Sequence, residues 1–317
     1  MRVGFVGLGR MGLPLALTLR RSGVPVVGYN RTQAKVEPLV AAGGTWAISP
    51  KEVARGVSGG VVFLMLTDGK AVKKILFSRG GIVRGAKSGT LVVDLSTIDP
   101  EESRTFAAQL GEKGIHYLDA PVGGSTEMAA KGEVTFFVGG DEHDVARVRP
   151  ILERMGRAVE HLGPVGAGTS MKLVNNLLTI GNTVLATEAL ALADGLHLER
   201  RRVLELLLAG GARSAMLERK GQSFLAGQYP AQFTTALARK DLRLAVKAGA
   251  REGRPLAMSR EARKLLDEAI AQGHSEDDFS SVLGATLARG RPSPTKTTTQ
   301  ATVLAPSVPT APGSDPP

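Results

Sequence analysis

One lysine and one asparagine interrupt an apolar segment whose spacing is helical. In the fragment GTSMKLVNNLL, Lys172 and Asn176 stand four residues apart, so they lie on one face of a helix. Thr179 and Thr183 extend this polar stripe, while leucine and valine side chains cover the other faces. A lysine desolvated by apolar neighbours has a lowered pKa and becomes a usable proton donor near neutral pH. The alternative interpretation is a lysine whose stem packs in the core while its ammonium group reaches water.

A proton donor of this kind suits the reduction of a carbonyl group. Hydride transfer from a nicotinamide to a carbonyl carbon leaves an alkoxide that needs a proton. A cofactor site is predicted at the start of the chain, where a GxGxxG spacing follows a strand expected at residues 3–6 and opens a helix expected at 13–21. The first glycine permits a tight turn, the second admits a pyrophosphate, and the third allows close helix packing. The residues of this phosphate loop are Gly7, Leu8, Gly9, Arg10, Met11 and Gly12.

The residues after the second predicted strand indicate which cofactor is bound. That strand, at residues 24–29, is followed by Asn30, Arg31 and Thr32. An enzyme that selects NAD carries an acidic residue here for the ribose hydroxyls, and a carboxylate would repel a 2′-phosphate. Arg31 can pair with that phosphate and Thr32 can donate a hydrogen bond. We therefore expect NADP, with NADPH preferred over NADH; a solvated arginine at a helix start is the alternative.

Short β-branched runs continue to alternate with helical patterns up to about residue 163. Strands are predicted at 60–66, 90–95, 116–120 and 135–139, and strands that alternate with crossover helices form a doubly wound parallel α/β sheet. Open sheets of this kind bind ligands at the carboxyl ends of their strands. Leu66, Thr67, Ser96 and Thr97 are therefore candidate cofactor neighbours, with turn and N-cap roles as the alternative.

The composition changes after the segment GPVGAG, at residues 163–168. No proline follows until Pro230, and apolar residues recur at helical spacing, which predicts a long helix starting near Ala167 and then an all-α domain. We expect an NAD(P)-binding Rossmann domain at residues 1–164 and an all-α domain at 165–288. Seven of the chain's 17 prolines lie in residues 289–317, which predicts a disordered tail.

Composition excludes several classes of function. The chain has no cysteine, and its five histidines are scattered, so we expect no metal site. The formal charge of +10 is spread along the chain and is accompanied by few aromatic residues, so it favours anionic ligands more than nucleic acid. No run of eighteen apolar residues lacks a charge, and Met1 leads directly into a predicted strand, which indicates a cytoplasmic protein without a membrane span.

Five motifs occur together in a fixed order. They are FVGLGRMG, DLST, DAPVGG at 119–124, GxGxxxKLVNN at 166–176, and FTTALARKDL at 233–242. Over about residues 1–288 this combination resembles the β-hydroxyacid dehydrogenase family, which includes 3-hydroxyisobutyrate dehydrogenases, tartronate semialdehyde reductases and glyoxylate/succinic semialdehyde reductases. The resemblance implies NAD(P)-dependent interconversion of small semialdehyde or keto acids with β-hydroxyacids. It also implies that the all-α domain at 165–288 is the substrate and oligomerisation domain of a homodimer or homotetramer.

The resemblance also implies roles for particular residues. Lys172 would be the general acid/base, and Asn176 would hold both the lysine and the substrate, with Asn175 beside it. Lys240 would lie over the cofactor and the active site, followed by Asp241. The family's loop reads DAPVSGG, and the position of its substrate-contacting serine is occupied here by Gly123.

This departure leaves the anion site open to two interpretations. Backbone N–H groups of Gly123 and Gly124 can still cradle an anion, and Ser125 or Thr126 can supply a hydroxyl. Sulfolactaldehyde reductases also carry glycine after PV but follow it with arginine, which Gly124 is not. We expect a carboxylate substrate, with a sulfonate as the alternative. An imine reductase, in which the lysine position usually carries another residue, and a non-catalytic NADP-binding module are the rival functions for the whole chain.

Overall fold

The first half of the chain folds around a six-stranded parallel sheet. The computed structural model describes residues 2–289, so the predicted tail, apart from Arg289, lies outside the described residues. The strands are β1 (Val3–Val6), β2 (Val26–Tyr29), β3 (Thr45–Trp46), β4 (Val61–Leu64), β5 (Leu91–Asp94) and β6 (His116–Asp119), in the order β3-β2-β1-β4-β5-β6. This confirms the predicted doubly wound α/β class, because the strand order reverses at β1.

Helices cover both faces of this sheet, since alternate side chains along each strand point to opposite faces. Val3 and Phe5 of β1 share a core with α1 (Gly12–Arg21), α2 (Glu37–Ala41), α6 (Thr126–Lys131) and α7 (Glu142–Leu152). Val62 and Leu64 of β4 share the opposite core with α3 (Pro50–Val57), α4 (Gly69–Phe77) and α5 (Pro100–Gly111). Short 3-10 turns at Gln33–Val36 and Ile82–Arg84 complete this half.

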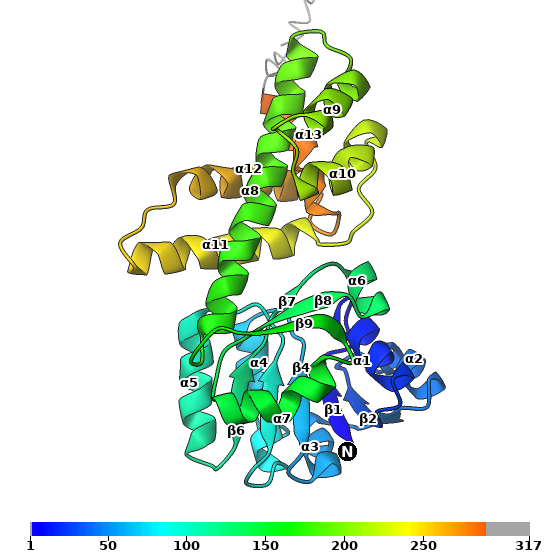
Figure 1. The fold of residues 1–317 in the computed structure, drawn as a ribbon, viewed down its shortest axis with the longest axis vertical. Coiled ribbons are helices and arrows are strands. Elements are labelled where there is room, and N and C mark those ends of the chain that lie inside the picture. The colour runs from blue at the N-terminus through cyan, green and yellow to red at the C-terminus, as the bar shows by residue number, and fades with distance from the viewer. Residues whose placement is uncertain (1, 290–317) are drawn as a thin grey trace, which may run out of the picture.

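A second, three-stranded sheet lies between the parallel sheet and the helical half (Figure 1). Its strands are β7 (Val122–Gly123), β8 (Val134–Val138) and β9 (Gly156–His161), in the order β7-β8-β9. The strand predicted at 135–139 forms as β8 but belongs to this sheet. Only residues 120–121 separate β6 from β7, too short a connection for a parallel crossover, so the chain turns out of the parallel sheet at this point.

The second half is built on one long helix, α8 (Ala167–Gly195), which begins where the sequence predicts. Around it pack α9 (Arg200–Ala209), α10 (Ala215–Ala226), α11 (Thr235–Arg251), α12 (Ala257–Ala271) and α13 (Val282–Arg289), with a 3-10 turn at Phe279–Ser281. Figure 1 shows α8 rising from the sheets through the helical half, with α11 and α12 projecting to one side as a hairpin. Ile180, Leu242 and Leu266 are fully buried in the core that these helices share.

The first turn of α8 is attached to the end of β6 through Asp119. This carboxylate accepts hydrogen bonds from Gly166 N at 2.7 Å, Thr169 N at 2.6 Å and Thr169 Oγ1 at 2.9 Å. The contact is also tight, because a Cβ added at Gly168 would lie 2.1 Å from Phe137 O, and one at Gly139 would lie 2.6 Å from Asp119 Oδ1. The start of α8 is therefore fixed against both sheets, three residues before Lys172.

Among residues 2–289, α8 has a length and mean hydropathy, 1.2 over its most apolar window, that would suffice to cross a membrane. A core helix of a globular fold has the same composition, and Leu173, Ile180 and Leu190 of α8 are buried among the neighbouring helices.

Candidate active site

The phosphate loop has the geometry that a bound pyrophosphate requires. Gly7 has a φ of +100°, and a Cβ there would lie 2.2 Å from Met65 O. A Cβ on Gly12 would lie 2.0 Å from Gly7 O, so this glycine allows α1 to approach the strand. A Cβ on Gly9 would meet no atom within 4 Å, and α1 has neither a side-chain cap nor an acidic residue in its first turn. Open space beside uncapped N–H groups fits an anionic cofactor.

Asn30, Arg31 and Thr32 lie at the end of β2, beside this loop. Asn30 Oδ1 accepts from Leu8 N at 3.1 Å, and Asn30 Nδ2 donates to Thr32 O at 3.0 Å. Asn30 therefore fixes the phosphate loop against the next loop. Arg31 and Thr32 are exposed, and the Thr32 side chain makes no cap hydrogen bond, so both remain available to a ligand.

Two further loops meet at the carboxyl ends of β4 and β5. Ser96 Oγ accepts from Leu66 N at 2.9 Å, while Ser96 N donates to Asp94 Oδ1 at 2.9 Å. Tyr117 also donates to Asp94, at 3.0 Å, and burial raises the pKa of this carboxyl to about 6 despite these bonds. Ser96 thus holds the two loops together, and Leu66 and Thr97 lie half-buried at the same edge of the sheet, next to the exposed Thr67.

Lys172 lies on the second turn of α8, where this helix leaves the sheets. The side chain is half-buried, and among residues 2–289 its Nζ has no hydrogen-bond partner within the chain. The pKa of Lys172 is lowered to about 8, chiefly by burial; the negative charge of Asp241 opposes this decrease, and the positive charge of Lys240 adds to it. An ammonium group with this pKa and no competing acceptor can give a proton to a bound oxygen near neutral pH.

A chain of polar contacts connects α8 with α11 and with the loop after β5. Asn175 Nδ2 donates to Asn176 Oδ1 at 3.0 Å, and Asn176 Nδ2 donates to Asp241 Oδ2 at 2.6 Å. Lys240 Nζ lies 2.8 Å from Asp241 Oδ1 and donates to Thr97 O at 2.6 Å. The structure therefore brings four predicted site residues, Asn175, Asn176, Lys240 and Thr97, into one network.

The loop with Gly123, Gly124 and Ser125 forms the end of β7 and the start of α6. A Cβ on Gly123 would lie 2.9 Å from the Phe137 ring, so a serine at this position would displace that ring. Gly124 is exposed with a φ of +142°, and the hydroxyl of Ser125 accepts from Met128 N at 3.2 Å as the N-cap of α6. Within the described part of the chain, no hydrogen bond links this loop to Lys172, Asn176 or Lys240.

Sequence reasoning did not identify two charged residues near this site, Arg219 and Asp99, and it did not foresee the contact that Arg10 of the phosphate loop makes with the helical half. Arg10 Nη1 donates to Ala231 O at 3.1 Å, so the phosphate loop contacts the helical half. Arg219 Nη2, on α10, lies 3.8 Å from the Met128 sulfur, next to the 123–125 loop. Asp99 binds two cations of α11. Each contact joins residues more than ninety positions apart, and no local pattern signals such a pair.

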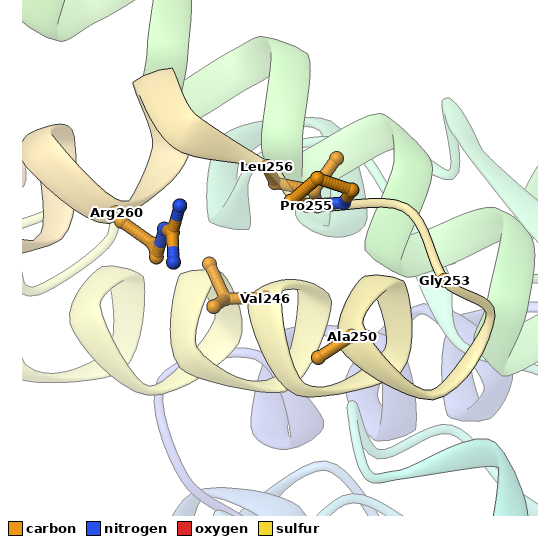
Figure 2. Close-up of a pocket in the computed structure, with 6 residues that line it drawn as sticks. All are labelled: Val246, Ala250, Gly253, Pro255, Leu256 and Arg260. Carbon is orange, nitrogen blue, oxygen red and sulfur yellow. The ribbon is translucent and has the colours of Figure 1, made fainter.

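A hollow on the helical half lies away from this site. It has a volume of about 310 Å³ and lies between α11 and α12. Figure 2 shows its lining, which is Val246, Ala250, Gly253, Pro255, Leu256 and Arg260. This lining is mostly apolar and contains no acid/base pair, so it does not supply the chemistry of carbonyl reduction. No cluster of three or more potential metal ligands occurs in residues 2–289.

Comparisons with known families account for both halves of the chain. Residues 2–163 match the NAD binding domain of 6-phosphogluconate dehydrogenase, and residues 166–286 match the NAD-binding domain of NADP-dependent 3-hydroxyisobutyrate dehydrogenase. The chain is 34% identical to 2-(hydroxymethyl)glutarate dehydrogenase of Eubacterium barkeri, over 89% of this chain and 94% of that protein. It is 32% identical to 2-hydroxy-3-oxopropionate reductase of Escherichia coli, over 90% and 97%.

Solved structures agree with these matches. A 3-hydroxyisobutyrate dehydrogenase from Salmonella typhimurium superposes with a TM-score of 0.82 and 28% identity, covering 90% of this chain and 99% of that one. An imine reductase from Myxococcus stipitatus has a TM-score of 0.64 at 19% identity, covering 89% and 98%, and shares the fold alone. The similarity in sequence is therefore to hydroxyacid dehydrogenases, and the similarity to the imine reductase is one of fold.

Proposed function

Because the chain belongs to the β-hydroxyacid dehydrogenase family of NAD(P)-dependent oxidoreductases, we propose that it is an NADPH-preferring reductase of small acids that carry an aldehyde or keto group. The reaction is reversible and yields β-hydroxyacids. The observation that carries this proposal is Lys172, whose pKa is lowered to about 8 where α8 leaves the sheets. It lies one turn from Asn176, which belongs to the network that reaches Thr97.

Lys172 acts as the general acid and base. The phosphate loop and the edge formed by Ser96 and Thr97 would hold NADPH, which would supply the hydride. During reduction, the Lys172 ammonium group donates its proton to the carbonyl oxygen of the substrate. During oxidation, the neutral amine removes the proton from the alcohol oxygen. Asn176, fixed by Asp241, orients the substrate on the same face of α8.

The acid group of the substrate binds at the 123–125 loop. Backbone N–H groups of Gly123 and Gly124 and the hydroxyl of Ser125 provide donors. Arg219 provides a positive charge from the opposite half, since its guanidinium contacts Met128 and has no carboxylate within 4 Å among residues 2–289. A carboxylate is preferred to a sulfonate, in keeping with the carboxylic acids named for the relatives from Eubacterium barkeri and Escherichia coli.

The preference for NADPH rests on the loop after β2. Arg31 and Thr32 are exposed, residues 30–36 include no acidic side chain that would repel a 2′-phosphate, and Asn30 holds this loop to the phosphate loop. A guanidinium group binds phosphate through charge-assisted hydrogen bonds.

The domain boundaries and the assembly form part of the same proposal. A cofactor domain at residues 1–164 and a helical domain at 165–288 meet at the start of α8. One face of α8 remains exposed and apolar, and it includes Val174, Leu178, Leu185 and Leu192, the last 63% exposed. A surface of this kind fits a second copy of the chain, which supports a homodimer or homotetramer. Light scattering on the eluting protein measures the number of copies.

The test measures NADPH consumption with glyoxylate, succinic, methylmalonic and tartronic semialdehydes, sulfolactaldehyde and a cyclic imine. We expect turnover of at least one carboxylate semialdehyde. Lys172→Ala should lower kcat/KM by about 10²- to 10⁴-fold, the range of general acid catalysis, and leave the Kd for NADPH unchanged. Lys220→Ala is unsuitable as a control because it breaks a buried ion pair, whereas Lys264→Ala changes only an exposed lysine of α12. Unaltered turnover in Lys172→Ala would refute the mechanism.

A further inference from the structure

Three cations on one face of α11 contact the loop after β5. Lys240, Lys247 and Arg251 are spaced i, i+7 and i+11, so they share a face of this helix. Lys240 Nζ donates to Thr97 O at 2.6 Å. The remaining two cations bind Asp99, two residues further along the same loop. The contact therefore extends over three turns of α11 beyond Lys240.

Asp99 is the centre of this contact. Its carboxylate is almost fully buried, accepts from Arg251 Nη1 at 2.8 and 3.0 Å, and forms an ion pair with Lys247 Nζ at 2.9 Å. Burial would raise the pKa of Asp99, but its contacts with Lys247 and Arg251 hold it below its usual value. Asp99 also caps α5, where its carboxylate accepts from Glu101 N at 3.1 Å.

The loop that Asp99 ends is itself rigid. Ser96 Oγ accepts from Leu66 N, and the side chain of Ile98 is fully buried in the core under α5. A helix attached at Asp99 is thus attached to the edge of the parallel sheet. Since α11 also carries Lys240 and Asp241, its distance from this edge sets where those two residues lie relative to the cofactor loop.

We propose that Asp99 is a positioning residue, which through Arg251 and Lys247 fixes α11 on the cofactor loop and so aligns Lys240 with Thr97 for the reaction. This inference rests on the proposed function for its kinetic consequence. The fold should persist when the ion pairs of Asp99 with Lys247 and Arg251 are removed. Arg251 and above all Lys247 remain partly exposed, so removal of the carboxylate charge leaves two hydrated cations and no unpaired buried charge.

Asp99→Asn separates positioning from capping, because asparagine is an equally good N-cap but carries no charge. Asp141→Asn is the matched control, since Asp141 caps α7 through His143 N and Asp144 N and forms no ion pair among the described residues. We expect Asp99→Asn to lower kcat roughly tenfold by misplacing α11, with the Kd for NADPH and the Tm close to those of Asp141→Asn. An unchanged kcat would overturn the proposal.

Two further measurements exclude a merely structural effect. The double variant Lys247→Met/Arg251→Met should lower kcat to the same extent, and adding Asp99→Asn should lower it no more, because all three residues act through one contact. Salt screens this partly exposed contact, so kcat of the wild type should fall with ionic strength and that of Asp99→Asn should not. Additive losses, or an equal salt dependence in both proteins, would overturn the proposal.

Amide hydrogen exchange distinguishes this inference from the proposed function. In Asp99→Asn, residues 243–251 of α11 should exchange faster than in Asp141→Asn, whether or not any tested acid is a substrate. Faster exchange without turnover in the wild type would leave the contact established and the proposed function wrong. Unchanged exchange would refute the contact itself.

Discussion

Asn176 and Asp241 join α8 to α11 through a hydrogen bond of 2.6 Å from Nδ2 to Oδ2. The second carboxylate oxygen, Asp241 Oδ1, is buried and lies 2.8 Å from Lys240 Nζ, although the angle between them does not allow a hydrogen bond. Burial lowers the pKa of Lys172, and the negative charge of Asp241 limits this decrease. Asp241 thus has two roles, since it orients Asn176 and keeps Lys172 protonated near neutral pH.

Asp241→Asn should move the alkaline limb of the reduction rate to lower pH. Without the carboxylate charge, burial and Lys240 both lower the pKa of Lys172 with nothing to oppose them. At pH 8 the variant should reduce substrate severalfold more slowly than the wild type. The measurement is the pH profile of kcat/KM. The control is Asp267→Asn, which removes a half-exposed carboxylate of α12 that pairs with Arg239. A limb at the wild-type position in both variants would contradict the role of Asp241.

The two directions of the wild-type reaction should depend oppositely on pH. Reduction needs the ammonium form of Lys172, so its rate should be constant below a pH of about 8 and decrease above it, whereas the rate of oxidation should increase through the same pH.

The free energy of unfolding should also depend on the protonation of Lys172. The lysine pKa is 10.5 in an unfolded chain and about 8 in the fold, so between these values the unfolded chain binds more protons and the free energy of unfolding increases with pH.

Urea unfolding at several pH values from 7.5 to 10.5 tests the stability effect. In Lys172→Met, the free energy of unfolding should lose the increase with pH that this lysine contributes. Near pH 7.5 this variant should be more stable than the wild type, which there holds a desolvated ammonium group. Equal pH slopes in the two proteins would mean that Lys172 keeps its ordinary pKa.

Arg31→Ala should remove most of the preference for NADPH. Charge-assisted hydrogen bonds contribute about 1.5–3 kcal/mol, so kcat/KM for NADPH should decrease roughly 10- to 150-fold while that for NADH stays within about twofold. Arg55→Ala, which removes an exposed arginine paired with Glu52 on α3, is the control. If the ratio of the two cofactors does not change, Arg31 is a solvated residue and the selectivity lies elsewhere.

Arg219→Gln should raise the KM for the acid substrate about tenfold or more, because an ionic partner of the anion is lost. The Kd for NADPH should not change. Arg213→Gln is the control, since Arg213 pairs with Glu218 and lies on the neighbouring turn. An equal KM in the wild type and both variants would assign anion binding to the 123–125 loop alone.

Local patterns predicted much of the cofactor half correctly. The strand before Gly7, the tight turn at that glycine and the helix opened by Gly12 all follow from spacing within a dozen residues, and the structure has each of them. The start of α8 was equally predictable from the long apolar run that follows GPVGAG, and the helix does begin at Ala167, after Gly166 with a φ of +94°. The alternation of strands and helices gave the parallel sheet, but it missed the two-residue connection that sends β7 and β8 into a separate sheet.

The long-range polar contacts of the site could not be predicted, because they depend on where distant segments meet. Asp119 lies 47 residues before Gly166, and Asp99 lies 152 residues before Arg251. Nothing in the composition of either segment selects one partner over the many arginines and lysines elsewhere in this basic chain. Lys172 and Asn176 were identifiable because both lie on one helix, where spacing fixes geometry.

Gly139 and Gly168, where the start of α8 contacts the sheets, restrict which substitutions this enzyme can accept. Positions 139 and 168 tolerate no Cβ, since the nearest atoms are backbone and carboxylate atoms that cannot move aside. In a library of random variants, either position should therefore behave like a catalytic residue and lose activity with alanine, although neither touches a substrate. Laboratory evolution toward new acid substrates would have to vary the loops around Lys172 and keep glycine at positions 139 and 168.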